Sequence, residues 1–266
     1  MVKKKYFVDA KEETTTSKGL TPVSLEVINK ESGKKEVKWI YIDNLGKTAI
    51  HQLYDHAGPF NARGFAMVRL DKDKNELYGF IDQTGKAVVP IIYDLVFPFN
   101  DIGYTKVKKN QMWGFVNLKG EEIIPTEYSI VELQTDNLIK VCKGSKWGYI
   151  NPFNNLVVPI KYDWVWNFCE ELLIVRNGEM HGAVNLKGEE VISLKYEMMK
   201  LFHDGLSAAK LQGKWGYLNT SGHIEISFVF DDAWNFDLGK AQVKVGNEFF
   251  FIDSEGEKLE SVFPTT

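Results

Sequence analysis

The hexapeptide Lys146-Trp147-Gly148-Tyr149-Ile150-Asn151 decides the fold, because close copies of it recur along the chain. The best matches are Trp113-Gly114-Phe115-Val116-Asn117 and Trp215-Gly216-Tyr217-Leu218-Asn219. We call the first residue of each such pentapeptide the lead and number later positions from it. The leads are Trp39, Tyr78, Trp113, Trp147, His181, Trp215 and Phe249. Their spacings of 39, 35, 34, 34, 34 and 34 residues predict a protein of about seven repeats.

Other residue types keep the same phase as the leads. A glycine follows the lead directly in five repeats, as Gly79, Gly114, Gly148, Gly182 and Gly216. Position 7 is glycine in six repeats and Asn154 in the fourth, and both types accept the positive φ of a tight turn. Position 15 is aromatic in six repeats, and an acid follows it in five of them. The whole period is therefore the structural unit.

Each repeat has the pattern of about three short β-strands. Residues 147–151 are aromatic and β-branched and lie between turn-forming residues, which is typical of a strand. Residues 138–146 predict a hairpin into that strand, and residues 156–159 predict a third strand. One small sheet cannot bury its own aromatic face. We therefore expect stacked repeats in which the lead tryptophans supply most of the buried area and the adjacent glycines allow close approach.

The repeat pattern also sets the domain boundaries. We expect residues 1–20 to form a polar, mobile N-terminal segment and residues 21–266 to form a single repeat domain. The one change in repeat length lies between Phe60 and Tyr78. It predicts a longer hairpin around residues 71–75.

The run from Lys146 to Asn151, followed by Val158-Pro159-Ile160-Lys161-Tyr162-Asp163 and then Phe168, resembles the bacterial WG-repeat family, also called KWG β-repeats. The resemblance extends from about Trp39 to Gly256 and is specific because several columns recur in register. Trp39, His181 and Phe249 depart from the Trp-Gly lead. The resemblance implies a repetitive β architecture and no shared catalytic activity, so it brings no active-site residues to this chain.

Two architectures fit seven β repeats, an open or spiral array and a closed propeller-like toroid. Three strands per repeat are fewer than the four of a usual propeller blade, and divergent terminal repeats suit the caps of an open array. Seven is, however, also a common number of propeller blades. We predict an all-β, open or spiral array of three-stranded repeats, with the closed toroid as the alternative.

Composition limits the function classes. The 266 residues are 44% hydrophobic and 26% charged, which is typical of a folded chain. The net charge of -4 leaves no positive excess for binding nucleic acid. No apolar run of about 18 residues predicts membrane insertion, and no signal peptide follows Lys5. We expect a cytoplasmic protein, with an exported mature domain as the alternative, in which Cys142 and Cys169 are ordinary thiols of undetermined redox state.

The sequence carries no motif for catalysis, metal binding or a cofactor. Its five histidines fall at five different phases, so they would not converge as ligands, and His181 is interpreted as a degenerate lead. Asp71, Asp73 and Asn75 share offsets with a calcium-binding loop, but Glu76 replaces its glycine, so a polar hairpin turn is the better interpretation. The recurring acid at position 16 fits a structural role, such as accepting turn N–H groups. We expect no catalytic residues, no metal and no cofactor.

Positions 17 and 19 vary most between repeats, and we call them the variable face. Their residues are His56 and Gly58, Leu95 and Phe97, Ile130 and Glu132, Trp164 and Trp166, Met198 and Lys200, and Asp232 and Trp234. A repeat that varies one segment on a fixed skeleton often binds its partner there. The candidate binding residues are Trp164, Trp166, Trp234, Phe97 and Met198, and burial in the core is the competing interpretation. The leading hypothesis is a non-catalytic scaffold for an unidentified protein partner. The alternative is a glycan-binding module using the same aromatics.

Overall fold

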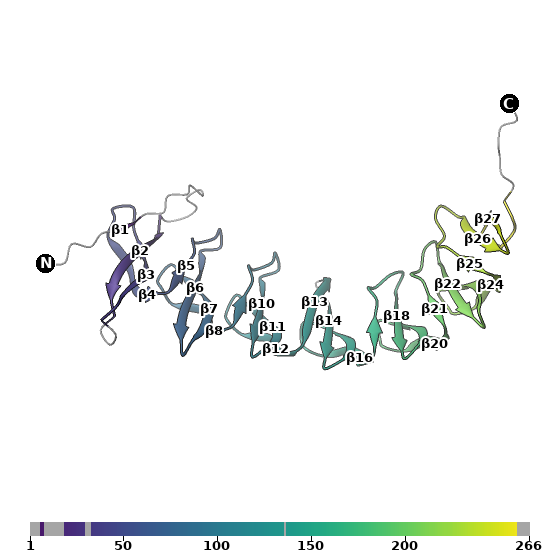
Figure 1. Ribbon diagram of the computed structural model, residues 1–266, viewed down its shortest axis with the longest axis horizontal. Coiled ribbons are helices and arrows are strands. Elements are labelled where there is room, and N and C mark those ends of the chain that lie inside the picture. Colours follow the sequence, from purple (N-terminus) through teal and green to yellow (C-terminus); the bar gives the residue numbers. More distant parts are fainter. Residues whose placement is uncertain (1–5, 8–18, 30–32, 136, 260–266) are drawn as a thin grey trace, which may run out of the picture. The chain divides into compact units, whose positions relative to one another are not determined.

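A computed structural model describes residues 6–7, 19–29, 33–135 and 137–259. The chain divides into two compact units, Met1–Ser129 and Ile130–Thr266, and each is described by itself. The described residues form small antiparallel sheets and no helix, and therefore no helix that could cross a membrane. We number the sheets in chain order, and Figure 1 shows each as a separate group of strands.

The N-terminal unit holds three sheets, each of four strands in sequence order among the described residues. Sheet 1 consists of β1 (Tyr6–Phe7), β2 (Thr21–Ile28), β3 (Lys35–Ile42) and β4 (Thr48–Tyr54). Sheet 2 consists of β5 (His56–Ala57), β6 (Phe65–Lys72), β7 (Asn75–Asp82) and β8 (Ala87–Tyr93). Sheet 3 consists of β9 (Leu95–Val96), β10 (Tyr104–Lys109), β11 (Met112–Asn117) and β12 (Glu122–Tyr128).

The C-terminal unit holds four sheets. Sheet 4 consists of β13 (Ile130–Thr135), β14 (Leu138–Lys143), β15 (Lys146–Ile150) and β16 (Leu156–Tyr162). Sheet 5 consists of β17 (Trp164–Val165), β18 (Leu172–Asn177), β19 (Met180–Asn185) and β20 (Glu190–Tyr196). Sheet 6 consists of β21 (Met198–Met199), β22 (Leu206–Leu211), β23 (Lys214–Asn219) and β24 (Ile224–Phe230). Sheet 7 consists of β25 (Asp232–Ala233), β26 (Ala241–Val245) and β27 (Glu248–Ile252).

The predicted all-β fold of about 34-residue repeats is confirmed, with one correction to its strand count. Six of the seven described sheets have four strands, where the sequence predicts three. The extra strand is usually two residues long, because the chain leaves one sheet at position 15 and begins pairing with the next sheet two residues later. Within each unit the sheets follow one another as an open array, and no sheet of the described residues closes into a barrel.

The lead strands of the first six repeats each carry a bulge where they pair with the following strand. In sheet 4 the register between β15 and β16 shifts on both sides of Tyr149. A Cβ atom at Gly148 would lie 2.6 Å from the carbonyl oxygen of Val158, so the two backbones touch there. The expected close approach beside the lead is thus confirmed. In sheet 1 Ile40 takes the glycine's place, and the register shift persists.

The turn after each lead strand is built in the same way seven times. The side chain at position 4 accepts the backbone N–H groups of positions 6 and 8, as Asn151 does from Phe153 and Asn155. The residue at position 7 has a positive φ in every repeat, with values from 59° at Asn154 to 86° at Gly85. The turn predicted from the glycine column is therefore confirmed, and its asparagine exception adopts the same conformation.

Within each unit, consecutive sheets share their cores, which explains why the repeats need one another. One cluster joins Tyr149 and Tyr162 of sheet 4 to Val165 and Val175 of sheet 5. The most deeply buried aromatics are Tyr41, Tyr54, Tyr149 and Tyr217, followed by Phe202 and Phe236. Trp147 and Trp215 are buried, but Trp39 and Trp113 are half-buried. The expectation that lead tryptophans dominate the core is therefore wrong for two of the four, and position 2 is the deeper one.

Two further expectations concern the N-terminal unit. The longer hairpin is confirmed, because β6 and β7 each have eight residues and a two-residue turn at Asp73 and Lys74, both at positive φ. Tyr6 and Phe7 pair with Leu25 and Ser24, so these two residues of the N-terminal segment belong to sheet 1. Residues 1–5 and 8–18 of that segment lie outside the described residues.

Candidate functional site

The variable face has a fixed backbone and changing side chains. In sheets 2, 3, 5, 6 and 7 position 19 follows the two-residue first strand, and its N–H donates to the neighbouring strand, as from Trp166 to Ile174 at 2.9 Å and from Trp234 to Gln242 at 3.0 Å. In three repeats the carbonyl of the same residue accepts a hydrogen bond from a tyrosine hydroxyl of the preceding sheet. Tyr41 donates to Gly58 at 2.7 Å, Tyr149 to Trp166 at 2.8 Å and Tyr217 to Trp234 at 2.7 Å.

Two repeats without this tyrosine satisfy the same carbonyl from the opposite side. Phe80 and Ala183 take the tyrosine's place. The carbonyl of Phe97 then accepts from Thr105 at 2.5 Å, and that of Lys200 accepts from Ser207 at 2.6 Å. Thr105 and Ser207 sit at equivalent register positions, where repeats with the tyrosine carry Ala66, Leu173 and Ala241. The carbonyls of Gly58, Phe97, Trp166, Lys200 and Trp234 thus each accept from one of two kinds of hydroxyl, a tyrosine of the preceding sheet or a Thr or Ser of the same sheet.

Three of the five predicted binding residues are exposed. Phe97, Met198 and Trp234 expose 43%, 47% and 38% of their surface, respectively. Phe97 contacts the lead Trp113, with ring centroids 6.0 Å apart, and Trp234 contacts the lead Phe249 at 6.1 Å. Each exposed aromatic therefore extends the surface of the following lead residue.

The other two predicted residues belong to an internal row of rings. Trp164 lies 4.8 Å from Trp147 and 6.4 Å from Trp166, which in turn lies 5.4 Å from His181. Both Trp164 and Trp166 are half-buried and pack against core clusters. The interpretation of these two residues as core therefore gains support, while their remaining surface borders the variable face.

Lysines contact the same rings, and sequence reasoning missed them. The Lys140 ammonium lies 4.9 Å from the Trp147 ring and 4.5 Å from the Trp164 ring. Lys140 is buried, which lowers its pKa, while Glu132 on the neighbouring strand acts in the opposite direction. Lys200 lies 5.0 Å from Trp215 and 5.4 Å from Trp234 and donates to the carbonyl of Ala233 at 2.6 Å. Cation–π contacts therefore cover part of the aromatic surface.

The acid at position 16 links consecutive sheets. Asp163 accepts from Lys146 at 2.6 Å and from the backbone N–H of Gly178, in the next hairpin turn, at 2.6 Å. Asp231 accepts from Lys214 at 2.5 Å and from Gly246 at 2.6 Å. The hydrogen bonds from the lysines are the main cause of the lowered pKa of both carboxyl groups. The expected structural role of this acid is confirmed.

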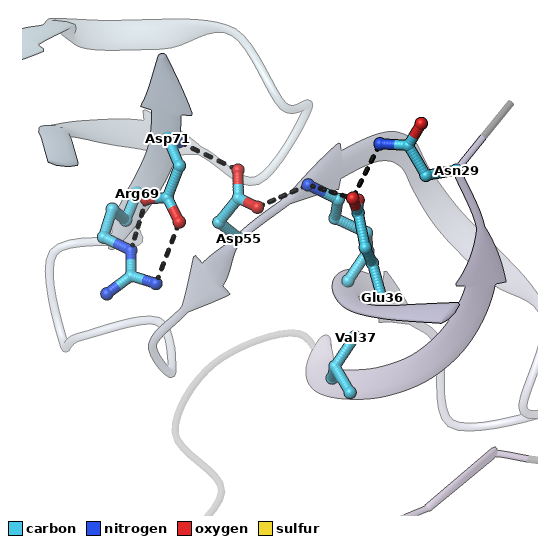
Figure 2. A pocket seen from close by; sticks show the side chains of 7 residues that line it. Asn29, Glu36, Val37, Asp55, Arg69 and Asp71 are labelled. Carbon is cyan, nitrogen blue, oxygen red and sulfur yellow. Dashed lines mark hydrogen bonds and ion pairs between the residues drawn. The ribbon is translucent and has the colours of Figure 1, made fainter. Parts of the chain in front are cut away.

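A polar depression of about 470 Å³ in the N-terminal unit contains a variant of this link (Figure 2). Asp55 accepts from Lys38 and, at 2.9 Å, from the backbone N–H of Asp71. Arg69 pairs with Asp71 and Glu76, each at 2.9 Å. The hydrogen bond to Asp55 raises the pKa of Lys38 against the effect of burial. These charges satisfy one another, so the depression is a feature of the repeat skeleton extended by the longer hairpin.

His181 and the two cysteines all lie in the C-terminal unit. His181 is buried at its lead position, and burial lowers its pKa. Cys142 and Cys169 form no disulfide bond with each other, and Cys169 donates to the carbonyl of Phe202 at 3.1 Å. Within the described ranges no group of three or more His, Cys, Asp or Glu side chains is arranged to hold a metal ion.

The repeat skeleton matches a known family over most of the chain. Six segments match the family described as WG containing repeat, namely residues 39–72, 78–113, 113–147, 147–180, 182–215 and 215–249. The chain belongs to the WG-repeat family. The WG-repeat segments begin at or next to the leads, and the resemblance inferred from the sequence is thereby confirmed. No curated protein matches the chain.

Likeness to solved structures is weak for this WG-repeat chain. Hsv2p of Kluyveromyces lactis is 15% identical over 74% of this chain and 73% of that chain, with a TM-score of 0.35. A eukaryotic initiation factor is 11% identical over 66% and 53%, with a TM-score of 0.35. The tricorn protease is 11% identical over 88% and 29%, with a TM-score of 0.30. Scores this low carry no functional conclusion.

Proposed function

We propose that this WG-repeat chain is a non-catalytic scaffold that binds a protein partner through its variable face. The main support is the contrast between a backbone held at position 19 by repeated hydrogen bonds and side chains there that range from glycine and glutamate to lysine, phenylalanine and tryptophan. The exposed Phe97, Met198 and Trp234 supply the large apolar side chains that protein interfaces favour. A bacterial origin and a cytoplasmic location belong to the same proposal.

The glycan-binding alternative has less support. Flat sugar rings stack on open aromatic faces, whereas the Trp234 ring has the Lys200 ammonium near it and Phe249 tilted at 55° beside it. Such a mixed surface of rings and cations suits a protein segment better. Unchanged tryptophan fluorescence across a glycan panel would support this ranking, and a saturable shift with one glycan would reverse it.

The test compares three forms of the full chain as bait in extracts of its native source. The double variant Met198→Ala with Trp234→Ala removes two exposed side chains of the variable face. Phe153→Ala is the matched control, because Phe153 is also largely exposed but lies in the turn between β15 and β16. A specific partner is retained by the wild type and by Phe153→Ala and is lost from the double variant. Equal retention by all three forms contradicts the proposal.

A further inference from the structure

Arg176 lies beside the variable face without a carboxylate partner. In β18 it pairs with Trp164 of the variable face on one side and with the lead His181 on the other. The side chain is half-buried, and its Nε atom is covered and has no hydrogen-bond partner among the described residues. No Asp or Glu of the described ranges forms an ion pair with its guanidinium. Five N–H donors make an arginine a strong binder of carboxylates, so its lack of one here is informative.

Arg69 shows how the same position is satisfied in another repeat. It occupies the register position of Arg176 in sheet 2, opposite the lead and opposite position 17. Its guanidinium pairs with Asp71 and Glu76, each at 2.9 Å, and Figure 2 shows the pair with Asp71. Both acids belong to the longer hairpin of β6 and β7. This position can therefore hold a guanidinium that binds carboxylates.

The shorter hairpin of sheet 5 does not supply the two acids. Its strands β18 and β19 have six residues each, compared with eight in β6 and β7. Gly178 stands two residues after Arg176, where Asp71 stands two residues after Arg69. Glu179 lies in the two-residue turn and makes no ion pair with Arg176 in the part of the chain that the structure describes. Sheet 5 thus keeps the guanidinium of the paired site without its internal carboxylates.

A second cation without a carboxylate lies beside the same tryptophan. The Lys140 ammonium is 4.5 Å from the centre of the Trp164 ring, and the side chain is 4% exposed. Lys200 also contacts two tryptophan rings, but it donates to the carbonyl of Ala233 at 2.6 Å. Within residues 33–135 and 137–259, Lys140 has no hydrogen bond or ion pair. Burial lowers the pKa of Lys140, and Glu132 offsets only part of this effect. A nearby carboxylate would stabilise such a buried charge.

The acids beside these two cations do not neutralise them by contact. Asp163 accepts from Lys146 and from a backbone N–H, and Arg176 acts on its carboxyl group only over a longer distance. Glu132 stands opposite Lys140 on β13 and forms no ion pair with it among the residues described. Because the cations and acids of this region nearly balance, an occupant is favoured by direct pairing with Arg176 rather than by net charge.

We propose that the variable face of sheets 4 and 5 binds an acidic segment of the partner protein, with one Asp or Glu carboxylate held by the Arg176 guanidinium beside Trp164. This inference rests on the proposed function of the variable face and names the chemistry of its partner. The carboxylate accepts from the two Nη atoms in a fork geometry, as an arginine allows and a lysine does not. The Trp164 ring packs against the aliphatic part of the acidic residue, and Lys140 adds a second positive charge beside that ring.

Two peptides of matched sequence test the carboxylate directly. The first contains four glutamates, two leucines and two glycines, and the second has glutamine in place of each glutamate. Each is titrated into the full chain, and nitrogen–proton correlation spectra follow the side-chain N–H signals of Arg176 and Trp164, which Arg176→Gln and Trp164→Phe identify. We expect both signals to shift saturably with the glutamate peptide and to stay in place with the glutamine peptide. Unmoved signals with the glutamate peptide, or equal shifts with both, overturn the proposal.

Three variants of the full chain locate the binding of the glutamate peptide. Arg176→Gln removes the guanidinium and is expected to weaken binding about tenfold or more. Lys140→Met keeps an apolar stem without the charge and is expected to weaken binding about threefold. Lys210→Gln is the matched control, because Lys210 holds the same register position in sheet 6, away from Trp164. It should leave the affinity within about twofold. Equal weakening by Arg176→Gln and Lys210→Gln shows a general charge effect and overturns the assignment.

A third peptide, with phosphoserine in place of each glutamate, tests the other oxyanion that arginine binds. Binding about tenfold or more tighter than that of the glutamate peptide identifies a phosphoryl group as the preferred ligand and overturns the carboxylate assignment. Any smaller difference supports it.

The partner captured from extracts separates this inference from the proposed function. We expect Arg176→Gln, used as bait, to lose the partner that the Met198→Ala with Trp234→Ala variant also loses. A partner that is lost from the double variant but retained by Arg176→Gln leaves the proposed function standing and overturns the acidic contact. A partner that every form retains overturns both.

Discussion

Trp147 and Phe249 hold the same position in two repeats, yet their surroundings differ. Trp147 is 9% exposed and packs with the shared core of sheets 4 and 5, whereas Phe249 is 55% exposed. Truncating a buried tryptophan costs about 3–5 kcal/mol. We expect Trp147→Ala to lower the free energy of unfolding by this amount and Phe249→Ala by about 0.5 kcal/mol or less. Chemical denaturation measures both, and a loss below about 1 kcal/mol for Trp147→Ala contradicts its role in the core.

Gly148 is required by space rather than by backbone conformation. A Cβ atom there would meet the carbonyl oxygens of Val158 at 2.6 Å and Pro159 at 2.8 Å, and both belong to a paired strand. We expect Gly148→Ala to destabilise the chain by about 1–3 kcal/mol. Gly58→Ala is the control, because its added carbon would approach the carbonyl of Met67 no closer than 3.4 Å. Equal losses from the two variants, measured by denaturation, would show that crowding at the bulge is not the cause.

At the scale of the strand, a tyrosine hydroxyl joins consecutive sheets in three repeats. Tyr217→Phe leaves the carbonyl of Trp234 without its side-chain donor, and we expect a loss of about 1–3 kcal/mol. Ala241 occupies the register position at which Ser207 and Thr105 satisfy the equivalent carbonyl in other repeats. Ala241→Ser should therefore restore part of the stability lost in Tyr217→Phe.

A double-mutant cycle measures this compensation between strands. The coupling between Tyr217→Phe and Ala241→Ser is expected to be favourable and to exceed about 0.5 kcal/mol, because both hydroxyls serve one acceptor. In the equivalent pair of another repeat, Tyr149→Phe with Leu173→Ser, we expect the serine to restore less stability, because Leu173→Ser also removes a large buried side chain. Strictly additive effects for Tyr217 and Ala241 would show that the two hydroxyls do not substitute for each other.

The aspartate link between sheets gives a pH dependence with a defined sign. The pKa of Asp163 is lowered in the folded chain, first by the hydrogen bond from Lys146 and then by that from Gly178. A lowered folded-state pKa stabilises the fold above the ordinary value of about 4 and loses this contribution as pH falls through the lowered value. We expect Asp163→Ala to destabilise the chain at pH 7 and to match the wild type in the most acidic range. Asp163→Asn, which keeps an acceptor for Gly178, should lie between them, and a difference that persists unchanged at low pH contradicts the linkage.

The elements that the sequence could predict are those with their own residue signature. The position 7 glycines, the position 4 Asn or Asp and the lead strands all have local chemistry that recurs, and the turns confirm it. The short strands such as Trp164–Val165 have none, because two residues form a strand only when the next sheet lies beside them. The half-burial of Trp113 and the exposure of Phe249 depend in the same way on neighbouring strands rather than on residue type.

At the scale of the whole molecule, the sequence indicated the variable face but not its internal contacts. Positions 17 and 19 differ between repeats, and this difference can be read directly from the sequence. The contacts of Lys140 with Trp147 and Trp164 cannot be read from the sequence, because they join residues from different strands and adjacent sheets.

Shared cores make the C-terminal unit a series of nearest-neighbour couplings. Sheets 6 and 7 share the cluster that contains Val243, whereas sheet 4 shares its cluster with sheet 5. Val243→Asp places a charge at a fully buried site and should unfold sheet 7. In a repeat array the damage is expected to fall steeply with distance. Hydrogen exchange of the full chain should therefore show lost protection in β22–β24 and nearly unchanged protection in β14–β16. A uniform loss from β14 to β24 would show instead that the C-terminal unit unfolds as one cooperative body.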